Sequence, residues 1–195
     1  MDNSIKEQLS YIQTVISDSR HAVANFGGGY VVWGMVIGTA SLLHYLYDLG
    51  VQNEFFHPGN IWGFANLTGI LLTIFFYRKK WKKRRVMSFG EKINIRIWMI
   101  TFIAIFFTGL APDLDAFNRY AMVAILVGCA IYLNGFIANL KFLQALGFAW
   151  LLSSALMFYS GKSSSMLINA FMNYVGFALP GIIILTKKNT YLKNE

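Results

Sequence analysis

The sequence predicts an all-α membrane protein, a six-transmembrane-helix bundle preceded by an amphipathic juxtamembrane helix. Of its 195 residues, 56% are hydrophobic and only 13% are charged. Soluble domains are typically about half apolar and about a quarter charged. A globule of this size cannot bury so much apolar surface, whereas a bilayer accepts apolar side chains on the outside of a helix bundle. Two further observations, the apolar runs and the distribution of basic residues, support the same fold class.

Residues 1–26 are expected to form a cytoplasmic segment whose core is an amphipathic helix over residues 3–24. Its aliphatic side chains recur at helical spacing, while charged and amide side chains fall between them. The aliphatic positions are Ile5, Leu9, Ile12, Ile16 and Val23. This pattern suits a helix on the membrane surface or against a partner. The glycines at 27–29 are expected to end it.

Residues 27–187 are expected to form the transmembrane domain, followed by a cytoplasmic tail at 188–195. Six apolar runs are each long enough to cross about 30 Å of hydrocarbon. They lie at about 29–48, 60–77, 93–111, 119–137, 141–159 and 167–186. Asn134-Gly135, Asn139 and Lys141 divide an apolar stretch that is too long for one span. Pro180 predicts a kink, because proline lacks the N–H that would bond the carbonyl of Gly176.

Basic residues predict the orientation of the bundle. With both termini in the cytoplasm, fifteen of the seventeen Lys and Arg residues lie on the inner side, and only Arg119 and Lys162 lie outside. Cytoplasmic loops of membrane proteins collect Lys and Arg in this way. The sequence therefore predicts a multi-pass protein with cytoplasmic N- and C-termini.

One basic octet, residues 78–85, accounts for much of the net charge of +8. Its seven cations are Arg78, Lys79, Lys80, Lys82, Lys83, Arg84 and Arg85. The octet lies between two apolar runs, which favours contact with anionic lipid headgroups or a protein partner and argues against nucleic acid.

Two GxxxG motifs are candidate helix-packing sites, because glycine at this spacing lets a neighbouring helix approach closely. Gly34 and Gly38 lie in the first span, and Gly59 and Gly63 lie at the start of the second. We favour packing of the first span on the second. The alternative is a contact between the two copies of a homodimer.

Amide side chains are the candidate polar interior of the spans. Asn66, Asn169 and Asn173 lie within apolar runs, and an amide in hydrocarbon needs a hydrogen-bonding partner. We favour ordinary bonding between helices, and the alternative is a polar path for a small substrate.

His44 and Asp48 are the weak metal-site candidates, four residues apart at the outer end of the first span. Their spacing matches no compact ligand motif, so no metal or cofactor is expected. The spans also hold no nucleophile elbow, phosphate-binding loop or paired intramembrane carboxylates. We therefore expect no enzymatic activity.

The opening of the chain resembles that of uncharacterised small bacterial six-transmembrane inner-membrane proteins. The resemblance is carried by Ser19-Arg20, Phe26-Gly27-Gly28-Gly29-Tyr30 and Trp33-Gly34. It implies a location in the bacterial inner (cytoplasmic) membrane and implies no activity.

Two functions remain open from the sequence. In the first, the protein is an accessory or regulatory membrane protein that acts through its basic cytoplasmic face. In the second, it is a small transporter or channel-like protein, with a path lined by the intramembrane asparagines and a homodimeric assembly. We favour the first, because the spans lack charge while the cytoplasmic segments are rich in it.

Overall fold

The computed structural model describes residues 3–51, 57–82, 86–111 and 114–186, and these ranges contain helices and no strand. Six of the helical segments are long and apolar enough to cross a membrane: Ser4–Asp48, Pro58–Arg78, Phe89–Leu110, Asn118–Ile137, Lys141–Ser160 and Lys162–Thr186. Each overlaps one of the six predicted spans, although the first begins far before residue 29. The architecture is therefore compatible with a multi-pass integral membrane protein, as the hydropathy pattern predicts.

Helix α1 is one continuous helix from Asn3 to Asp48, 46 residues long. The predicted break at the three glycines is wrong, and a separate juxtamembrane helix is not confirmed. A Cβ added at Gly27 would lie 2.9 Å from Ile184 and 3.3 Å from the carbonyl of Gly181. Gly27 thus lets the last span approach α1 closely, whereas among the described residues an added Cβ at Gly28 would meet only the Tyr77 hydroxyl and one at Gly29 would meet Phe26 of α1 itself. Continuing the helix also keeps the backbone hydrogen-bonded in apolar surroundings.

The next two spans are α2, Pro58–Lys82, and α3, Phe89–Leu110. Helix α3 begins four residues earlier than predicted because of a capping box. The hydroxyl of Ser88 accepts the Glu91 N–H at 3.3 Å, and the Glu91 carboxylate accepts the Ser88 N–H at 3.1 Å. These two bonds satisfy N–H groups that the first turn of a helix leaves without partners.

Helices α4, Ala116–Ile137, and α5, Lys141–Ser160, form a hairpin that divides the long apolar stretch as predicted. The turn is at Asn139, which has a φ of 51°, a left-handed conformation that asparagine tolerates. Gly135 lies inside α4, where an added Cβ would stand 2.7 Å from the backbone nitrogen of Gln144. Gly135 therefore lets α5 pack closely on α4 and is not part of the turn.

The last span is made of three segments in sequence: α6, Lys162–Asn173; the π-helix η2, Tyr174–Ala178; and α7, Leu179–Thr186. The irregular turn immediately precedes Pro180, where the sequence predicts a disturbance of the helix. Gly176 lies four residues before this proline, so its carbonyl lacks the usual α-helical donor. The indole N–H of Trp150 in α5 donates to this carbonyl at 3.2 Å.

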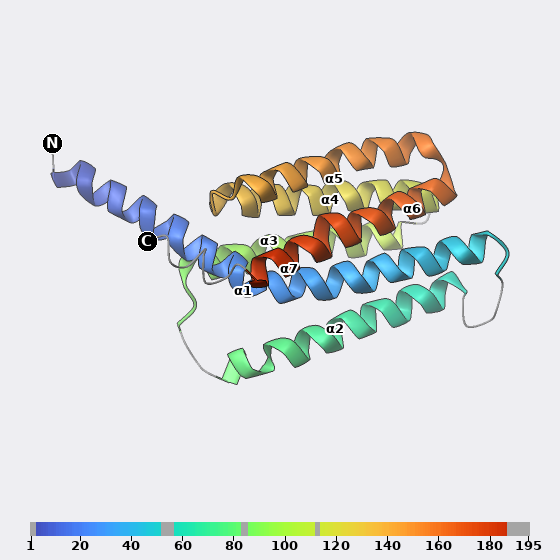
Figure 1. Cartoon of the computed structure of the whole chain (residues 1–195), viewed down its shortest axis with the longest axis horizontal. Coiled ribbons are helices and arrows are strands. Elements are labelled where there is room, and N and C mark those ends of the chain that lie inside the picture. The colour runs from blue at the N-terminus through green and yellow to red at the C-terminus, as the bar shows by residue number, and fades with distance from the viewer. Residues whose placement is uncertain (1–2, 52–56, 83–85, 112–113, 187–195) are drawn as a thin grey trace.

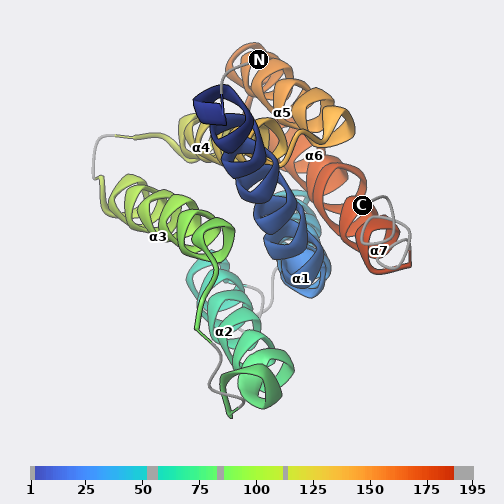
Figure 2. The same ribbon diagram turned by 90° about the vertical axis from the view of Figure 1, so that its left-hand side faces the viewer.

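Helix α1 is the central element, with α2, α3 and the last span packed around it (Figure 1). Helix α2 packs mainly on α1 and stands at the edge of the bundle (Figure 2). Only 11% of the most apolar stretch of α2 is buried against other helices, whereas 56% of the corresponding stretch of the last span is buried. Figure 1 also shows the start of α1 projecting beyond the other helices, at the end of the long axis where α2 and α7 also end. We call this the arm end of the bundle and the opposite one the far end.

Candidate functional site

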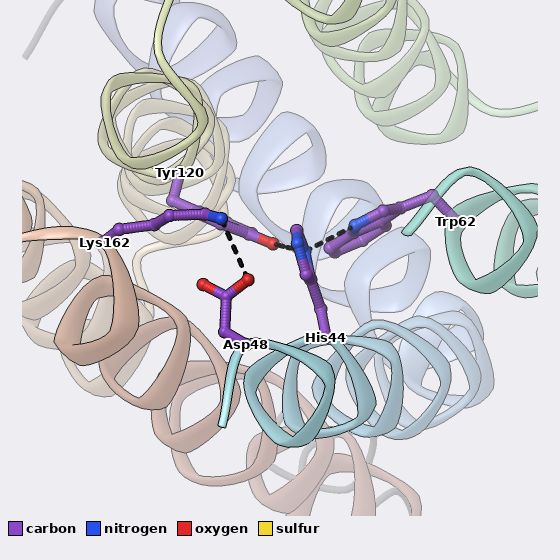
Figure 3. Close-up of polar contacts among 5 residues, drawn as sticks. All are labelled: His44, Asp48, Trp62, Tyr120 and Lys162. Carbon is purple, nitrogen blue, oxygen red and sulfur yellow. Dashed lines mark hydrogen bonds and ion pairs between the residues drawn. The ribbon is translucent and has the colours of Figure 1, made fainter. Parts of the chain in front are cut away.

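A polar cluster at the far end of the bundle contains both weak metal-site candidates. Figure 3 shows His44 and Asp48 from α1 together with Trp62 from α2, Tyr120 from α4 and Lys162 from α6. The side chains of His44 and Tyr120 are buried, with 6% and 7% of each residue exposed. The cluster joins four helices, two of which, α4 and α6, are far from α1 in the sequence.

The Nδ1 atom of His44 lies within hydrogen-bonding distance of two donors, which share its single lone pair. The Trp62 Nε1 atom lies 3.2 Å away, and the Tyr120 hydroxyl lies 2.6 Å away. An indole N–H is only a donor, so His44 Nδ1 must carry a lone pair and the tyrosine hydroxyl must donate as well. The ring is therefore the tautomer with its proton on Nε2. In this state His44 links α1 to α2 and α4 through hydrogen bonds.

Asp48, one turn further along α1, forms an ion pair with Lys162 at 2.9 Å. The side chain of Lys162 is 48% exposed and that of Asp48 is 13% exposed. A pair this accessible contributes about 0–1 kcal/mol. It nevertheless sets the position of the start of α6 against the end of α1. In the part of the chain that the structure describes, no group of three or more His, Cys, Asp or Glu side chains lies close enough to hold a metal ion. His44 and Asp48 thus act in this structure as helix-joining residues.

We expect Trp62→Phe to loosen the far end of α2, because it keeps an aromatic ring but removes the donor to His44. A partly buried hydrogen bond of this kind is worth about 1 kcal/mol. Amide hydrogen exchange of α2 in detergent micelles should rise several-fold near Trp62 and remain unchanged near Tyr77. Tyr47→Phe, at the same end, is the matched control and should leave both regions unchanged. Equal exchange in wild type and Trp62→Phe would show that this bond does not hold α2.

The two GxxxG motifs have different surroundings. A Cβ added at Gly34 would lie 2.5 Å from the backbone nitrogen of Ala178 and 2.7 Å from the carbonyl oxygen of Asn173. Gly38 faces the ring of Tyr174 in the same span. The predicted packing of these glycines on the second span is therefore wrong: they hold the last span, whose π-helical turn brings its backbone against α1. Among the described residues, a Cβ at Gly59 would meet only His57, and one at Gly63 would meet nothing within 4 Å.

The three predicted interior asparagines do not come together. Asn169 and Asn173 are buried, and they face α1 from the last span. The Asn169 amide donates to the Ser41 hydroxyl at 2.7 Å, and the Asn173 amide donates to the carbonyl of Asn169 at 2.8 Å. Asn66 is exposed on α2, where its amide donates to the carbonyl of Trp62 in its own helix.

A groove between α1 and α2 has a volume of about 470 Å³. Its walls are apolar except for two hydroxyls, those of Thr39 and Thr68, and include Met35, Leu43, Ile61 and Ala65. None of the three asparagines lines it. The polar path of the transporter alternative thus receives no support from this groove or from the contacts of the asparagines.

The arm end presents the other predicted functional residues. Residues 4–14 of α1, which we call the arm, are all exposed. Within the basic octet, Arg78 is exposed and residues 78–82 form the end of α2. Lys83, Arg84 and Arg85 lie outside the described residues, and so do the side chains of Lys79, Lys80 and Lys82. The predicted contact of the octet with lipid or a partner stays a prediction.

Several residues of these sites escaped sequence-based prediction: Trp62, Tyr120, Lys162, Ser41 and Trp150. Aromatic residues at the ends of spans are ordinarily interface anchors, so Trp62 and Tyr120 had no sequence signal that distinguished them as partners of His44. Trp150 had an indirect signal, because Pro180 leaves a carbonyl that needs another donor.

The comparisons with known proteins find no matching family model, no matching curated protein and no matching solved structure.

Proposed function

We propose that this integral membrane protein is a non-enzymatic accessory protein that presents the arm of α1 to an amphipathic helix of an acidic cytoplasmic partner. The observation that supports the proposal is the exposed aliphatic stripe on a rigidly anchored helix. The bacterial inner membrane, with both termini cytoplasmic, is the location that we propose from the resemblance and from the Lys and Arg distribution.

The length of α1 requires part of it to leave the bilayer. A helix of 46 residues is about 70 Å long at 1.5 Å per residue, against a hydrocarbon core of about 30 Å. The arm accounts for about 16 Å of that length. Because α1 is continuous, the arm extends along the direction of the span and does not lie flat beside it (Figure 1).

Contacts at the base of the arm fix its direction. A Cβ added at Gly90, at the start of α3, would lie 2.5 Å from the backbone of Asp18 and Ser19. The guanidinium of Arg20 donates to the carbonyl of Ala138 at 3.0 Å, at the carboxyl end of α4. A cation is favoured there, because the last carbonyls of a helix carry partial negative charge. The arm therefore projects from a base that two other helices hold.

One face of the arm is apolar and uncovered. Ile5, Leu9 and Ile12 are 47%, 47% and 55% exposed, and their spacing places them on a single stripe. Ile16 extends this stripe into the half-buried base of the arm. Spacings of four, three and four residues are those by which one helix packs on another in a coiled coil. The stripe thus fits the apolar face of a second helix.

Charge favours an acidic partner. Helix α2 ends at the same end of the bundle (Figure 1), and it carries the exposed Arg78, the first of the seven cations that the sequence gives to the octet. Anionic lipid headgroups would engage part of this charge, at about 1 kcal/mol per basic side chain near the surface. The basic side chains that lipid does not engage would attract a partner helix whose apolar face is flanked by carboxylates.

A photo-crosslinking amino acid placed at Leu9 tests the proposal in intact cells. We expect an adduct with one protein of defined mass, with the yield falling roughly tenfold or more when Ile5 and Ile12 are changed to serine. Each of these side chains stabilises a helix contact by about 1.5–3 kcal/mol when it is buried, so losing two of them has a large effect.

The opposite face of the arm supplies the matched controls. The same cross-linker at Thr14, on the polar side of α1, should give no protein adduct, and Glu7→Gln with Ser10→Ala should leave the Leu9 adduct unchanged. Cross-linking at Leu9 only to lipid would contradict the proposal and indicate a helix that lies on the membrane. Equal yields from both faces would also contradict it.

A further inference from the structure

A second uncovered surface lies on α2, within the predicted membrane span. Gly59, Gly63, Asn66 and Ile70 are spaced by four, three and four residues, so they share one face of this helix. All four are exposed. We call this surface the Asn66 face. The Asn66 face belongs to α2, and only 11% of the most apolar stretch of this helix is buried.

Gly63 differs from the glycines that bring the helices of this bundle together. An added Cβ would lie within 2.9 Å of another helix at each of Gly34, Gly135, Gly147 and Gly181. At Gly63 nothing lies within 4 Å of that position. Another helix thus fills the space beside these four glycines, whereas Gly63, like Gly109 in α3, has no neighbouring helix among the described residues.

Asn66 is a second, independent sign that the Asn66 face is covered in the assembled protein. It lies near the middle of α2, where the surrounding medium is hydrocarbon. By contrast, Asn94, Asn134, Asn169 and Asn173 are all buried. The Asn66 amide nitrogen donates to the carbonyl of Trp62 in the same helix, and among the described residues no hydrogen bond joins Asn66 to another helix. The carbonyl oxygens of Asn94 and Asn169 also lack a partner, so exposure is what distinguishes Asn66. Lipid chains offer no donor, so the amide is incompletely satisfied as long as α2 faces only lipid.

We propose that two copies of this chain pair through the Asn66 face of α2, with Asn66 of each copy bonded to Asn66 of the other. An amide carries both donors and an acceptor, so two identical amides related by a two-fold axis can each donate to the other. Gly59 and Gly63 let the two α2 backbones approach closely enough for this contact. A second copy therefore satisfies the Asn66 carbonyl, and a lipid chain does not.

Cysteine cross-linking in native membranes tests the pairing. In a Cys129→Ser background, which removes the single native cysteine, Gly63→Cys should form a disulfide-linked dimer on mild oxidation. The open space at Gly63 accepts the new side chain without disturbing the fold. Phe64→Cys is the matched control, because it lies at the same depth but is turned by about 100° around the helix. It should cross-link at least tenfold less.

Asn66→Leu tests the amide pair itself. Hydrogen bonds between membrane helices are worth about 0.6–2 kcal/mol, so the dimer dissociation constant in liposomes should rise roughly 3- to 30-fold. The dissociation constant is measured by energy transfer between labelled copies at graded protein-to-lipid ratios. Leu71→Ala, an exposed change outside the Asn66 face, should leave it unchanged.

Equal cross-linking at Gly63→Cys and Phe64→Cys would overturn the proposal, because random collision would then account for both. A chain that remains monomeric at every density would also overturn it. Pairing with an unchanged dissociation constant in Asn66→Leu would place the contact on another surface. None of these results depends on the arm of α1, so they leave the proposed accessory function untouched.

Discussion

Gly34→Ala is expected to destabilise the folded chain by about 1–3 kcal/mol, the usual cost of forcing an extra methyl group into a packed interior. The new Cβ would meet the backbone nitrogen of Ala178 at 2.5 Å and the carbonyl oxygen of Asn173 at 2.7 Å. Both are backbone atoms, so no side chain can rotate away to make room. The last span must therefore move away from α1 as a unit. The midpoint of unfolding in mixed detergent micelles should fall accordingly.

Gly63→Ala is the matched control, because it places the same methyl group in the second GxxxG motif. No atom of the part of the chain that the structure describes lies within 4 Å of the position of the new Cβ. Alanine also has the higher helix propensity, by up to about 1 kcal/mol. Under conditions in which the chain is monomeric, we expect unchanged or slightly raised stability. Equal destabilisation at the two glycines would mean that the contact between α1 and the last span is not as close as described here.

Trp150→Ala is expected to have the largest effect of any single substitution considered for this chain. Trp150 is 1% exposed and is among the largest fully buried side chains. Replacing a buried tryptophan by alanine typically costs about 3–5 kcal/mol. The substitution also removes the donor to Gly176, four residues before Pro180. The unfolding midpoint should fall well below that of Phe148→Ala, a neighbouring change at an exposed position.

A double-mutant cycle isolates the hydrogen bond from the packing. Trp150→Phe keeps most of the ring but removes the donor, and should cost about 1–3 kcal/mol. Pro180→Ala restores a backbone N–H that can bond the carbonyl of Gly176. In that background Trp150→Phe should cost less, by about 1 kcal/mol. If Trp150→Phe costs the same in both backgrounds, Trp150 does not compensate for the proline.

Much of the fold could be predicted from local signals. Hydropathy located all six spans, and the turn residues around Asn139 divided the long apolar stretch into α4 and α5. The start of α3 was readable from Ser88 and Glu91, although the apolar run begins four residues later. The three glycines were misleading, because glycine breaks helices in water but lets helices pack closely in apolar surroundings.

The candidate sites were less predictable. The sequence placed His44 beside Asp48 on one helix turn, but it gave no indication that Trp62 and Tyr120 would converge on the imidazole. It also treated Asn66, Asn169 and Asn173 as one class. The structure places Asn169 and Asn173 against α1 and leaves Asn66 on the outer surface of α2. The two GxxxG motifs differ in the same way: Gly34 and Gly38 pack against the last span, whereas Gly63 lies on the outer surface of α2.

By itself, the sequence determined that this chain forms six helices long and apolar enough to span a membrane, and it located each of them within a few residues except for the start of the first. Length and hydropathy of a segment suffice for that, because each span satisfies its backbone hydrogen bonds within itself. Only the tertiary structure decided which face of each helix is covered. In hydrocarbon an apolar face gains little from burial, so composition does not reveal the partners of a helix; close packing and a few polar contacts select them. Those contacts cover Gly34 and Asn169, while the arm and the Asn66 face stay open.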